Sequence, residues 1–403
     1  MQSGTPVDDR GQSGFGAIIA PLSVEQFLAD TFGRAPLHVQ GKSGRFKDLL
    51  DWDGLARLLE TQHLAPPRLE LVKAGKAIPG ERFLRPISSG IDRIDGGALS
   101  LLLDSGATAI INHIDNLLPA VGALADEIGD CLSARTAVNL YASWRSEHGF
   151  DAHWDYHDFI ILQLAGRKQW TIHKPTRPDP LRGDAFEPLP EGAKPHCVET
   201  LEDGDALYLP RGWIHAPVPL DGPSMHLTIG IVRPTGAGFL AWLANELQED
   251  PQVRAAIPLA GSGPARAEWE RRIADIVDAA IAGGAVERYI TIKDAKRGAR
   301  PRFSFPDFGR APQSEWQAAT TFRSVSLHRL IIEDKGEGKA SVTAMGRAWP
   351  CSSAVAAALA RITSTVPVTL EALEAGLSPS DKAELRQMLE LLVKFGLVAT
   401  RSP

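Results

Sequence analysis

Three side chains in the middle of the chain could together bind a metal ion. His153 and Asp155 stand two positions apart in the segment GFDAHWDYHDFIILQLAGRKQW, residues 149–170. Side chains two apart on a β-strand share a face, so this pair would point into one cavity. His215 could add a third ligand, because it follows a predicted strand and a Pro-Arg-Gly turn in GDALYLPRGWIHAP. Two imidazoles and one carboxylate form the facial triad that holds iron(II) and leaves adjacent positions open.

Each part of this triad also has a plainer interpretation. An HxD pair arises by chance in many chains as surface residues at a strand start, and a loop histidine is usually hydrogen-bonded in place. His157, two positions beyond Asp155, has the same strand parity, but a third ligand on that face would leave the metal less open. We interpret the other histidines as structural: His38, His63, His113, His148, His173, His196, His226 and His328.

A metal with open positions could bind a keto acid such as 2-oxoglutarate, whose far carboxylate then needs a buried cation. Lys168 is the candidate for that cation. We expect Ala165-Gly166 to form a turn that reverses the chain, which places Lys168 on the strand after the one that carries the HxD pair. Arg167 and Lys168 alternate in facing, so only one can point inward, and spacing alone does not choose between them. In isolation, a lysine here would be a solvated charge at a strand end.

Polar and aromatic side chains near these segments could complete a cavity. Asn139 and Tyr141 stand two apart in AVNLYASW, and Thr228 lies in HLTIGIVRP. They could hydrogen-bond a ligand, although a polar strand interior satisfied by its own neighbours explains them equally well. Four aromatic residues could form the cavity wall, although such residues are more often plain core: Trp154, Tyr156, Trp170 and Trp213.

The elements that must position these residues are mostly short strands. From about residue 69, β-like runs separated by glycine and proline follow one another, including LELVKAG, AVNLYASW, FIILQLAG, DALYLPRG and HLTIGIVRP. Many short strands with such turns predict a β-sandwich or a small barrel. One predicted helix, residues 117–128, interrupts them, and two others, residues 23–31 and 46–60, precede them and should pack outside the core.

The remainder of the chain is predicted to be largely helical. Apolar spacing predicts helices over residues 239–247 and 264–281, and the Lys-, Arg- and Pro-rich segment 293–312 is typical of a linker. A last unit begins near Thr320. In it, Ser378-Pro379 should start a helix that ends at Gly396, before a short strand-like LVAT.

Composition limits the class of protein. A chain of 403 residues predicts two or three domains, at least one of them large enough to enclose a site. Mixed charge with a net value of -6 argues against disorder and against a broadly cationic nucleic-acid binder. Three separated cysteines in no CxxC spacing argue against disulfides and structural zinc. Without a signal pattern or a membrane-length apolar run, we expect a cytoplasmic protein with no membrane partner.

Taken together, these motifs resemble the ribosomal oxygenase branch of the JmjC, cupin-like hydroxylases. The resemblance runs over GFDAHWDYHDFIILQLAGRKQW, NLYAS, GDALYLPRGWIHAP and SMHLTIG, and more loosely over PLSVEQFLADTFGRAPLHV, or roughly residues 20 to 235. It implies iron ligands at His153, Asp155 and His215. It also places the basic residue that binds 2-oxoglutarate at Lys168, and an asparagine near the co-substrate at Asn139.

The resemblance further implies a mainly β, double-stranded β-helix (jelly-roll) core with flanking helices, a helical dimerisation region and a C-terminal winged-helix-like α+β domain. The helical and terminal modules predicted above are consistent with that plan. The expected segments are a flexible N-terminus (1–20), a JmjC catalytic domain (21–235), a helical region that forms a homodimer (236–290), a linker (291–319) and a winged-helix-like domain (320–403).

The implied activity is that of an iron(II)- and 2-oxoglutarate-dependent oxygenase. It would consume 2-oxoglutarate and O2, release succinate and CO2, and hydroxylate a protein or peptide side chain, such as one in a ribosomal protein; nucleic acid is not expected as its substrate. Demethylation of N-methyl-lysine uses the same metal chemistry and is the enzymatic alternative. A non-catalytic scaffold on a cupin frame is less favoured because the triad is intact. A zinc hydrolase is less favoured because hydrolysis would not explain Lys168.

Overall fold

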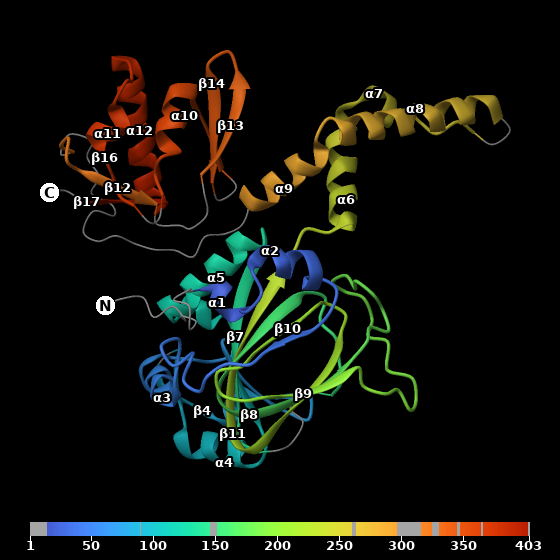
Figure 1. Cartoon of the computed structure of the whole chain (residues 1–403), viewed down its shortest axis with the longest axis vertical. Helices are drawn as coiled ribbons and strands as arrows, with labels where there is room; N and C mark the ends of the chain where they lie inside the picture. Colours follow the sequence, from blue (N-terminus) through green and yellow to red (C-terminus); the bar gives the residue numbers. More distant parts are fainter. Residues whose placement is uncertain are drawn as a thin grey trace. The chain divides into compact units, whose positions relative to one another are not determined.

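The computed structural model describes residues 14–88, 90–145, 151–259, 263–295, 316–324, 330–344, 347–363 and 366–401. The chain forms two compact units that divide between Arg233 and Pro234, and each is described by itself (Figure 1). Outside the described residues lie most of the predicted flexible N-terminus, His148, His328 and much of the predicted linker. Within the described ranges, no helix has both the length and the apolar character needed to cross a membrane.

The first unit is built on one large antiparallel sheet, and the predicted β-like runs lie in its strands. Nine strands form it, in the order β1-β10-β8-β11-β7-β6-β2-β3 with β9 paired to β8, and the two longest strands, β8 and β11, are neighbours (Figure 1). The strands are β1 (Leu37–Val39), β2 (Leu69–Lys73), β3 (Lys76–Ile78), β6 (Thr108–Ile111), β7 (Arg135–Ser143), β8 (Asp158–His173), β9 (Cys197–Leu201), β10 (Ala206–Leu209) and β11 (Ile214–Val232).

Strands β8 and β11 share a bulge near their middle. We expected the chain to reverse at Ala165-Gly166, and this prediction is wrong, because β8 continues through these residues and β11 pairs with it on both sides. The register of β11 shifts between Leu220 and Met225. Gly166 has a φ of 65°, and a Cβ at this position would lie 2.0 Å from the Pro223 carbonyl oxygen. Glycine therefore lets the strand bend where a larger residue would collide with β11.

The bulge changes which residues of β8 face the inside of the fold. Before it, the odd-numbered Phe159 and Ile161 pack into an inner apolar cluster, whereas Ile160 joins the core that the helices cover. After it, the even-numbered Trp170 and Ile172 belong to the inner cluster. One inserted residue therefore reverses the alternation, so even positions beyond the bulge share a face with odd positions before it.

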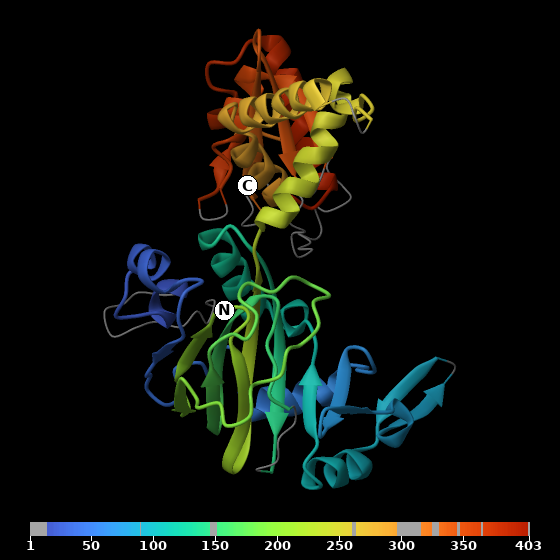
Figure 2. The same ribbon diagram turned by 90° about the vertical axis from the view of Figure 1, so that its right-hand side faces the viewer.

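Short helices and one hairpin surround the sheet, and the hairpin projects from an edge of the unit (Figure 2). The predicted Ser23 cap is confirmed, since its side chain accepts a hydrogen bond from Gln26 N. The helix predicted over residues 46–60 begins only at Trp52, because Asp51 caps it. These elements are α1 (Phe15–Ile18), α2 (Val24–Gln26), π-helical η1 (Phe27–Thr31), α3 (Trp52–Thr61), η2 (Gly80–Arg82), β4 (Leu84–Ser88), β5 (Ile91–Ile94), α4 (Gly96–Asp104), η3 (Ile114–Asn116) and α5 (Pro119–Cys131).

The second unit begins with helices and continues as a smaller α+β fold. Helix α9 continues past residue 290, where we expected the linker to start, and Trp316 already packs into the core of the last fold. Ser378 caps the final helix as predicted, and Gly396 follows its end. The helices are α6 (Gly236–Glu246), η4 (Leu247–Glu249), α7 (Pro251–Arg254), α8 (Gly263–Ala282), α9 (Ala285–Ala295), α10 (Ser353–Leu359), α11 (Leu370–Glu374) and α12 (Pro379–Lys394).

Two small antiparallel sheets complete this unit, in the orders β16-β12-β17 and β13-β14-β15. They consist of β12 (Thr321–Ser324), β13 (Ile331–Gly336), β14 (Lys339–Ala344), β15 (Arg347–Ser352), β16 (Val368–Thr369) and β17 (Val398–Arg401). Leu385, Leu389 and Leu392 of α12 are fully buried in a core that these sheets and helices share. This core is separate from the apolar clusters of the first unit.

Candidate metal and co-substrate site

The structure brings His153, Asp155 and His215 together. One ligand atom of each lies within 4.8 Å of the others. His215 is the second residue of β11, which places it directly after the turn that follows β10. His215 Nε2 lies 3.8 Å from Asp155 Oδ2, and the two imidazole rings are 4.5 Å apart between centroids. The three donors therefore surround a space that one ion could fill.

The HxD pair reaches this place from a loop, and the expectation that it lies on a strand is wrong. His153 and Asp155 precede the first residue of β8, and His153 forms an isolated antiparallel bridge with His215. In this bridge His153 N donates to His215 O at 3.2 Å, and His215 N donates to His153 O at 2.8 Å. Two backbone hydrogen bonds thus fix the spacing of the imidazoles. Lys168 therefore lies on β8, the first strand after the HxD pair, whereas we expected one strand to carry the pair and the next strand to carry Lys168.

Backbone carbonyls also fix the orientation of both imidazoles. His153 Nδ1 lies 2.7 Å from Asp151 O, and His215 Nδ1 lies 3.1 Å from Trp213 O. A carbonyl only accepts, so each Nδ1 donates and each Nε2 keeps a lone pair suited to a metal. Burial lowers the pKa of His215 to about 4, which keeps this imidazole neutral at physiological pH.

His157, the competing histidine, stays outside the group of three. Its ring packs against Gly230, where an added Cβ would lie 2.9 Å from ring atoms, and next to Tyr156 and Phe159. Its Nδ1 is buried and has no hydrogen-bond partner within the described residues. The structure therefore shows His157 as a packed side chain outside the ligand group.

A cavity of about 300 Å³ opens beside the three ligands. Both halves of β8 and of β11 contribute to its wall, together with β6 and β7. Its lining residues are Thr108, Tyr141, Ser143, His153, Asp155, Phe159, Lys168, Trp170, His215, Pro217, Pro219, His226 and Thr228. The bulge in β8 explains why Phe159 and Lys168 line the same cavity although they are an odd number of residues apart. A small organic acid beside a metal ion fits a space of this size.

Lys168 places a buried cation in this cavity. Its side chain is only 3% exposed, and Nζ lies 3.3 Å from His226 Nδ1 and 3.5 Å from Ser143 Oγ. In the described part of the chain, no carboxylate pairs with this ammonium group. Burial lowers the pKa of Lys168 to about 7. A buried cation without a counter-charge is costly, so the cavity suits an anionic ligand.

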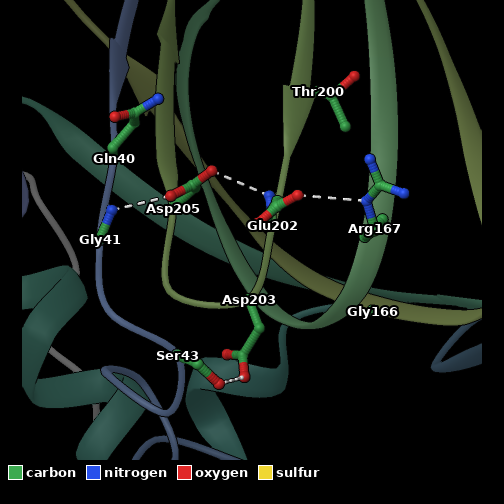
Figure 3. Close-up of a pocket in the computed structure, with 9 residues that line it drawn as sticks. All are labelled: Gln40, Gly41, Ser43, Gly166, Arg167, Thr200, Glu202, Asp203 and Asp205. Atoms are coloured by element: carbon green, nitrogen blue, oxygen red, sulfur yellow. Dashed lines mark hydrogen bonds and ion pairs between the residues drawn. The ribbon is translucent and has the colours of Figure 1, made fainter.

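Arg167 points the other way and contributes to a different hollow. It lies 3.3 Å from Glu202 and 2.8 Å from Asp221, and Figure 3 shows its side chain directed towards Glu202. This second hollow, of about 660 Å³, is lined by polar groups that already bind one another, such as Asp205 with Gly41 N at 2.8 Å and with Glu202 N at 2.9 Å. Of the two neighbouring cations, only Lys168 faces the metal ligands.

The three polar residues singled out in the sequence divide into two that line the cavity and one beside it. Tyr141 and Thr228 belong to the wall. Asn139 is absent from the lining residues; its Oδ1 accepts from His113 N at 3.0 Å, and its side chain hydrogen-bonds Tyr141. Burial, and after it the charge of Asp155, raises the pKa of Tyr141 to about 12, so the hydroxyl stays protonated and can donate.

Sequence reasoning missed several wall residues and proposed some that lie elsewhere. Ser143 and His226 line the cavity, and both extend a known alternation: Ser143 lies two beyond Tyr141, and His226 two before Thr228. Counting onward by two would have found them. Of the four aromatic candidates only Trp170 lines the cavity, while the others have separate ring neighbours: Trp154 with Phe186, Tyr156 with His157, and Trp213 with His196.

Comparison with known families identifies the class of this domain. Residues 111–239 match the family model of the JmjC domain. They contain the three candidate ligands, Lys168 and the whole of β7, β8 and β11. This segment is therefore similar to a JmjC domain, and the mostly antiparallel sheet agrees with the cupin-like fold of that family.

The curated relatives to which the chain is similar carry two kinds of name. "Ribosomal oxygenase 1" of Gallus gallus is 27% identical over 262 residues, which covers 60% of this chain and 41% of that protein. The "Bifunctional lysine-specific demethylase and histidyl-hydroxylase NO66" of Drosophila persimilis is 24% identical over 276 residues, which covers 64% of this chain and 39% of that protein. The chain thus spans well under half the length of either relative.

The likeness to a bacterial ribosomal oxygenase extends over nearly the whole chain. YcfD, "a Ribosomal oxygenase from Escherichia coli in complex with Cobalt and succinic acid", superposes with a TM-score of 0.59 at 18% identity, over 95% of this chain and 99% of that one. The same protein in complex with cobalt and 2-oxoglutarate gives a TM-score of 0.58. At this level of identity the likeness shows a shared fold.

Proposed function

We propose that this protein is an iron(II)- and 2-oxoglutarate-dependent oxygenase that hydroxylates a side chain of a protein or peptide. The observation that carries the proposal is one cavity containing both the His153–Asp155–His215 group and a buried Lys168 that has no carboxylate partner among the described residues. A metal at one end and a cation further along match a dicarboxylic keto acid, which has a chelating end and a far carboxylate.

The residues present fit iron(II). Two imidazoles whose Nδ1 atoms face backbone carbonyls, together with one carboxylate, make a mixed nitrogen and oxygen donor set. Among the described residues three protein ligands converge, which leaves positions for a co-substrate. The carbonyls of Asp151 and Trp213 supply the outer hydrogen bonds that such imidazoles need. When bound, the iron supplies the redox chemistry by which O2 and 2-oxoglutarate yield succinate, CO2 and a hydroxylated product.

The protein's own side chains bind and shield the co-substrate. We assign Lys168 to the far carboxylate, with hydrogen bonds from the hydroxyl groups of Tyr141 and Thr228. Asn139 supports the orientation of Tyr141 through their side-chain hydrogen bond. Phe159 and Trp170 form apolar wall that limits the entry of water, which strengthens each electrostatic contact inside the cavity.

The proposed substrate is a protein, and a ribosomal protein is the first candidate. The printed names of the relatives supply this support, since they describe ribosomal oxygenases and a histidyl-hydroxylase. The same names include a lysine-specific demethylase, so demethylation is the second candidate activity. We also propose that the region 236–290 forms a homodimer and that the last domain is winged-helix-like, as the family resemblance implies.

The first prediction tests the three ligands. His153→Ala, Asp155→Ala and His215→Ala should each lower 2-oxoglutarate turnover by more than about 100-fold, because two protein ligands cannot hold the ion in the working geometry. Succinate formation by the purified protein with iron(II) and O2 measures this loss, and His63→Ala, an exposed histidine away from the cavity, is the matched control. Normal succinate output from any of the three variants would refute the assignment.

Mass spectrometry of the protein substrate separates the two activities. Candidate ribosomal proteins and methylated lysine peptides are incubated with the enzyme, iron(II) and 2-oxoglutarate. Hydroxylation adds the mass of one oxygen atom, whereas demethylation removes a methyl group and releases formaldehyde. An oxygen gain that needs intact His153 supports hydroxylation, and loss of methyl groups without such a gain would replace it with the demethylase.

A further inference from the structure

His226 is a buried polar residue in the cavity wall to which the proposed function gives no role. It lies on β11 opposite Tyr141 of β7 and opposite Gln163 of β8. Its side chain is 3% exposed, and Nδ1 lies 3.3 Å from Lys168 Nζ. It is therefore a direct neighbour of the cation that we assign to the co-substrate, and it is not one of the metal ligands.

Two aromatic rings fix the orientation of this imidazole. The Tyr141 ring stacks on it with centroids 5.0 Å apart and an interplanar angle of 4°. The Trp170 ring meets it edge to face, with centroids 5.7 Å apart and an angle of 79°. A ring held from two directions cannot turn freely, so Nδ1 keeps facing the ammonium group of Lys168.

The identity of the two partners determines where the proton on His226 lies. An ammonium group donates hydrogen bonds and cannot accept them, so Nδ1 accepts and the single proton of the neutral imidazole is on Nε2. A protonated His226 would instead point an N–H group at Lys168 and repel it. Burial, and after it the charge of Lys168, lowers the pKa of His226 well below its usual value, which agrees with a neutral ring.

Lys168 needs such a partner because its other contact is weak. Ser143 Oγ lies 3.5 Å from Nζ, at the limit of a hydrogen bond, and it also interacts with Thr108 Oγ1 at 3.0 Å. A lysine side chain has four rotatable bonds, so an ammonium group held only by a distant hydroxyl would sample several positions in the cavity. The acceptor on His226 selects one of them before the ligand arrives.

We infer that His226 is a positioning residue for the co-substrate, which accepts a hydrogen bond at Nδ1 and so holds the Lys168 ammonium group where the far carboxylate of a dicarboxylate binds. The inference rests on the proposed function and adds to it the residue that pre-orders the anion subsite. It requires an acceptor at the Nδ1 position of residue 226, and it requires no contact between His226 and the metal.

The second prediction compares three substitutions of His226. His226→Leu removes the acceptor, and His226→Gln places its amide group near the former Nε2, so both should weaken 2-oxoglutarate binding by about 10- to 100-fold. His226→Asn places its carbonyl oxygen near the former Nδ1 and should restore binding to within about three-fold of the wild type. Titration of each full-length protein with 2-oxoglutarate in the presence of Mn²⁺ and without O2 measures the affinity apart from turnover.

A double-mutant cycle shows whether His226 acts through Lys168. In a Lys168→Met background, His226→Leu should cause no further loss, since the group that it positions is already gone. The Mn²⁺ affinity should be the same in every variant, and circular dichroism excludes variants that do not fold. Equal affinity for 2-oxoglutarate in the wild type and His226→Leu, or an Asn variant as weak as Leu, would overturn the inference. A wild-type protein that binds no 2-oxoglutarate would instead overturn the proposed function.

Discussion

Lys168 shows how a single buried charge indicates the kind of ligand that a cavity takes. In the described structure its ammonium group has a hydroxyl and an imidazole as neighbours but no carboxylate. Removing a charge from water without a partner is expensive, and proteins seldom tolerate it unless a ligand completes the site. The lowered pKa of Lys168, about 7, expresses the same cost, because burial favours the neutral amine. A bound dianionic ligand would instead favour the charged ammonium form of Lys168.

The third prediction follows from the sign of that pKa shift. Below about pH 7 the free protein already carries the charged lysine, whereas above it the protein must take up a proton in order to bind the anion. The affinity for 2-oxoglutarate should therefore fall as the pH rises from 7 to 9, by up to about ten-fold per unit. Binding titrations in the presence of Mn²⁺ measure the slope.

Two substitutions of Lys168 serve as controls for this pH dependence. Lys168→Arg keeps its charge throughout the range, so its affinity should vary little with pH. Lys168→Met should bind weakly, also without a slope. An equal decline in affinity for the wild type and the Arg variant would mean that another group titrates, and it would contradict the low pKa of Lys168.

At the scale of residues, the metal ligands were predicted more completely from the sequence than the residues that line the cavity. The residue types of His153, Asp155 and His215, together with the family resemblance, predicted that they meet, and the structure brings them together. Ser143 and His226 were missed although each continues an alternation that was already in use. Tyr141 and Thr228 were predicted because their hydroxyl groups can hydrogen-bond a ligand. Alternate residues of a strand share one face, so Ser143 and His226 line the same cavity as these neighbours.

At the scale of elements, the bulge shared by β8 and β11 explains why alternation could not choose between Arg167 and Lys168. Counting by two from Phe159, which faces the cavity, leads to Arg167. The bend at Gly166 inserts one residue and so directs Lys168 inward. On β11 the residues that face the cavity also change from odd to even numbers at the bulge. Pro217 and Pro219 line the cavity before it, and His226 and Thr228 line it afterwards. A glycine in a predicted strand indicates such a defect but not its form.

The fourth prediction concerns this bend. Gly166→Ala should lower the free energy of unfolding by about 1–3 kcal/mol and weaken 2-oxoglutarate binding, because the new Cβ would meet the Pro223 carbonyl at 2.0 Å and displace the strand that carries Lys168. Gly183→Ala is the matched control, since this glycine also has a positive φ, 96°, but nothing lies within 4 Å of an added Cβ. Urea unfolding gives the first quantity and ligand titration the second. Equal losses for both variants would show that only the backbone conformation matters.

The loop that carries the HxD pair marks a limit of strand-based reasoning. We placed His153 and Asp155 on a strand because two-residue spacing explains a shared face most simply. In the structure the side chains of His153 and Asp155 reach the same site from an irregular segment before β8. This segment is held in place by one β-bridge between His153 and His215. A single bridge depends on a residue more than 60 positions away in the sequence, and no local pattern records such a contact.

At the scale of the whole molecule, the sequence predicted β-like runs up to about residue 235 and mainly helices after it, and the structure forms two compact units that divide between Arg233 and Pro234. Apolar periodicity and turn residues were sufficient for this, because they reflect burial within each element. The order of the strands in the sheet was beyond reach, since β11 pairs with both β7 and β8, and β10 pairs with β1, through contacts distant in sequence. Caps such as Ser23 and Ser378 were predictable because their hydrogen bonds are local.

Each unit of the chain also has apolar cores of its own. Leu124 of α5 is 2% exposed in the core of the first unit, and Leu392 of α12 is fully buried in that of the second. Among the residues that the structure describes, none belongs to both of these clusters. Because burial of apolar surface is the main favourable term in folding, a defect in one core should act chiefly on the unit that contains it.

The fifth prediction measures this independence. Leu392→Ala should destabilise the second unit by about 2–5 kcal/mol, the usual cost of a cavity in a packed core, while 2-oxoglutarate affinity stays that of the wild type. Leu124→Ala should destabilise the first unit and leave the unfolding transition of the second unit unchanged. Scanning calorimetry of the full-length chain should resolve two transitions and show which one each substitution moves. If both transitions moved together in either variant, the two units would unfold as one, and separate cores would not mean separate stabilities.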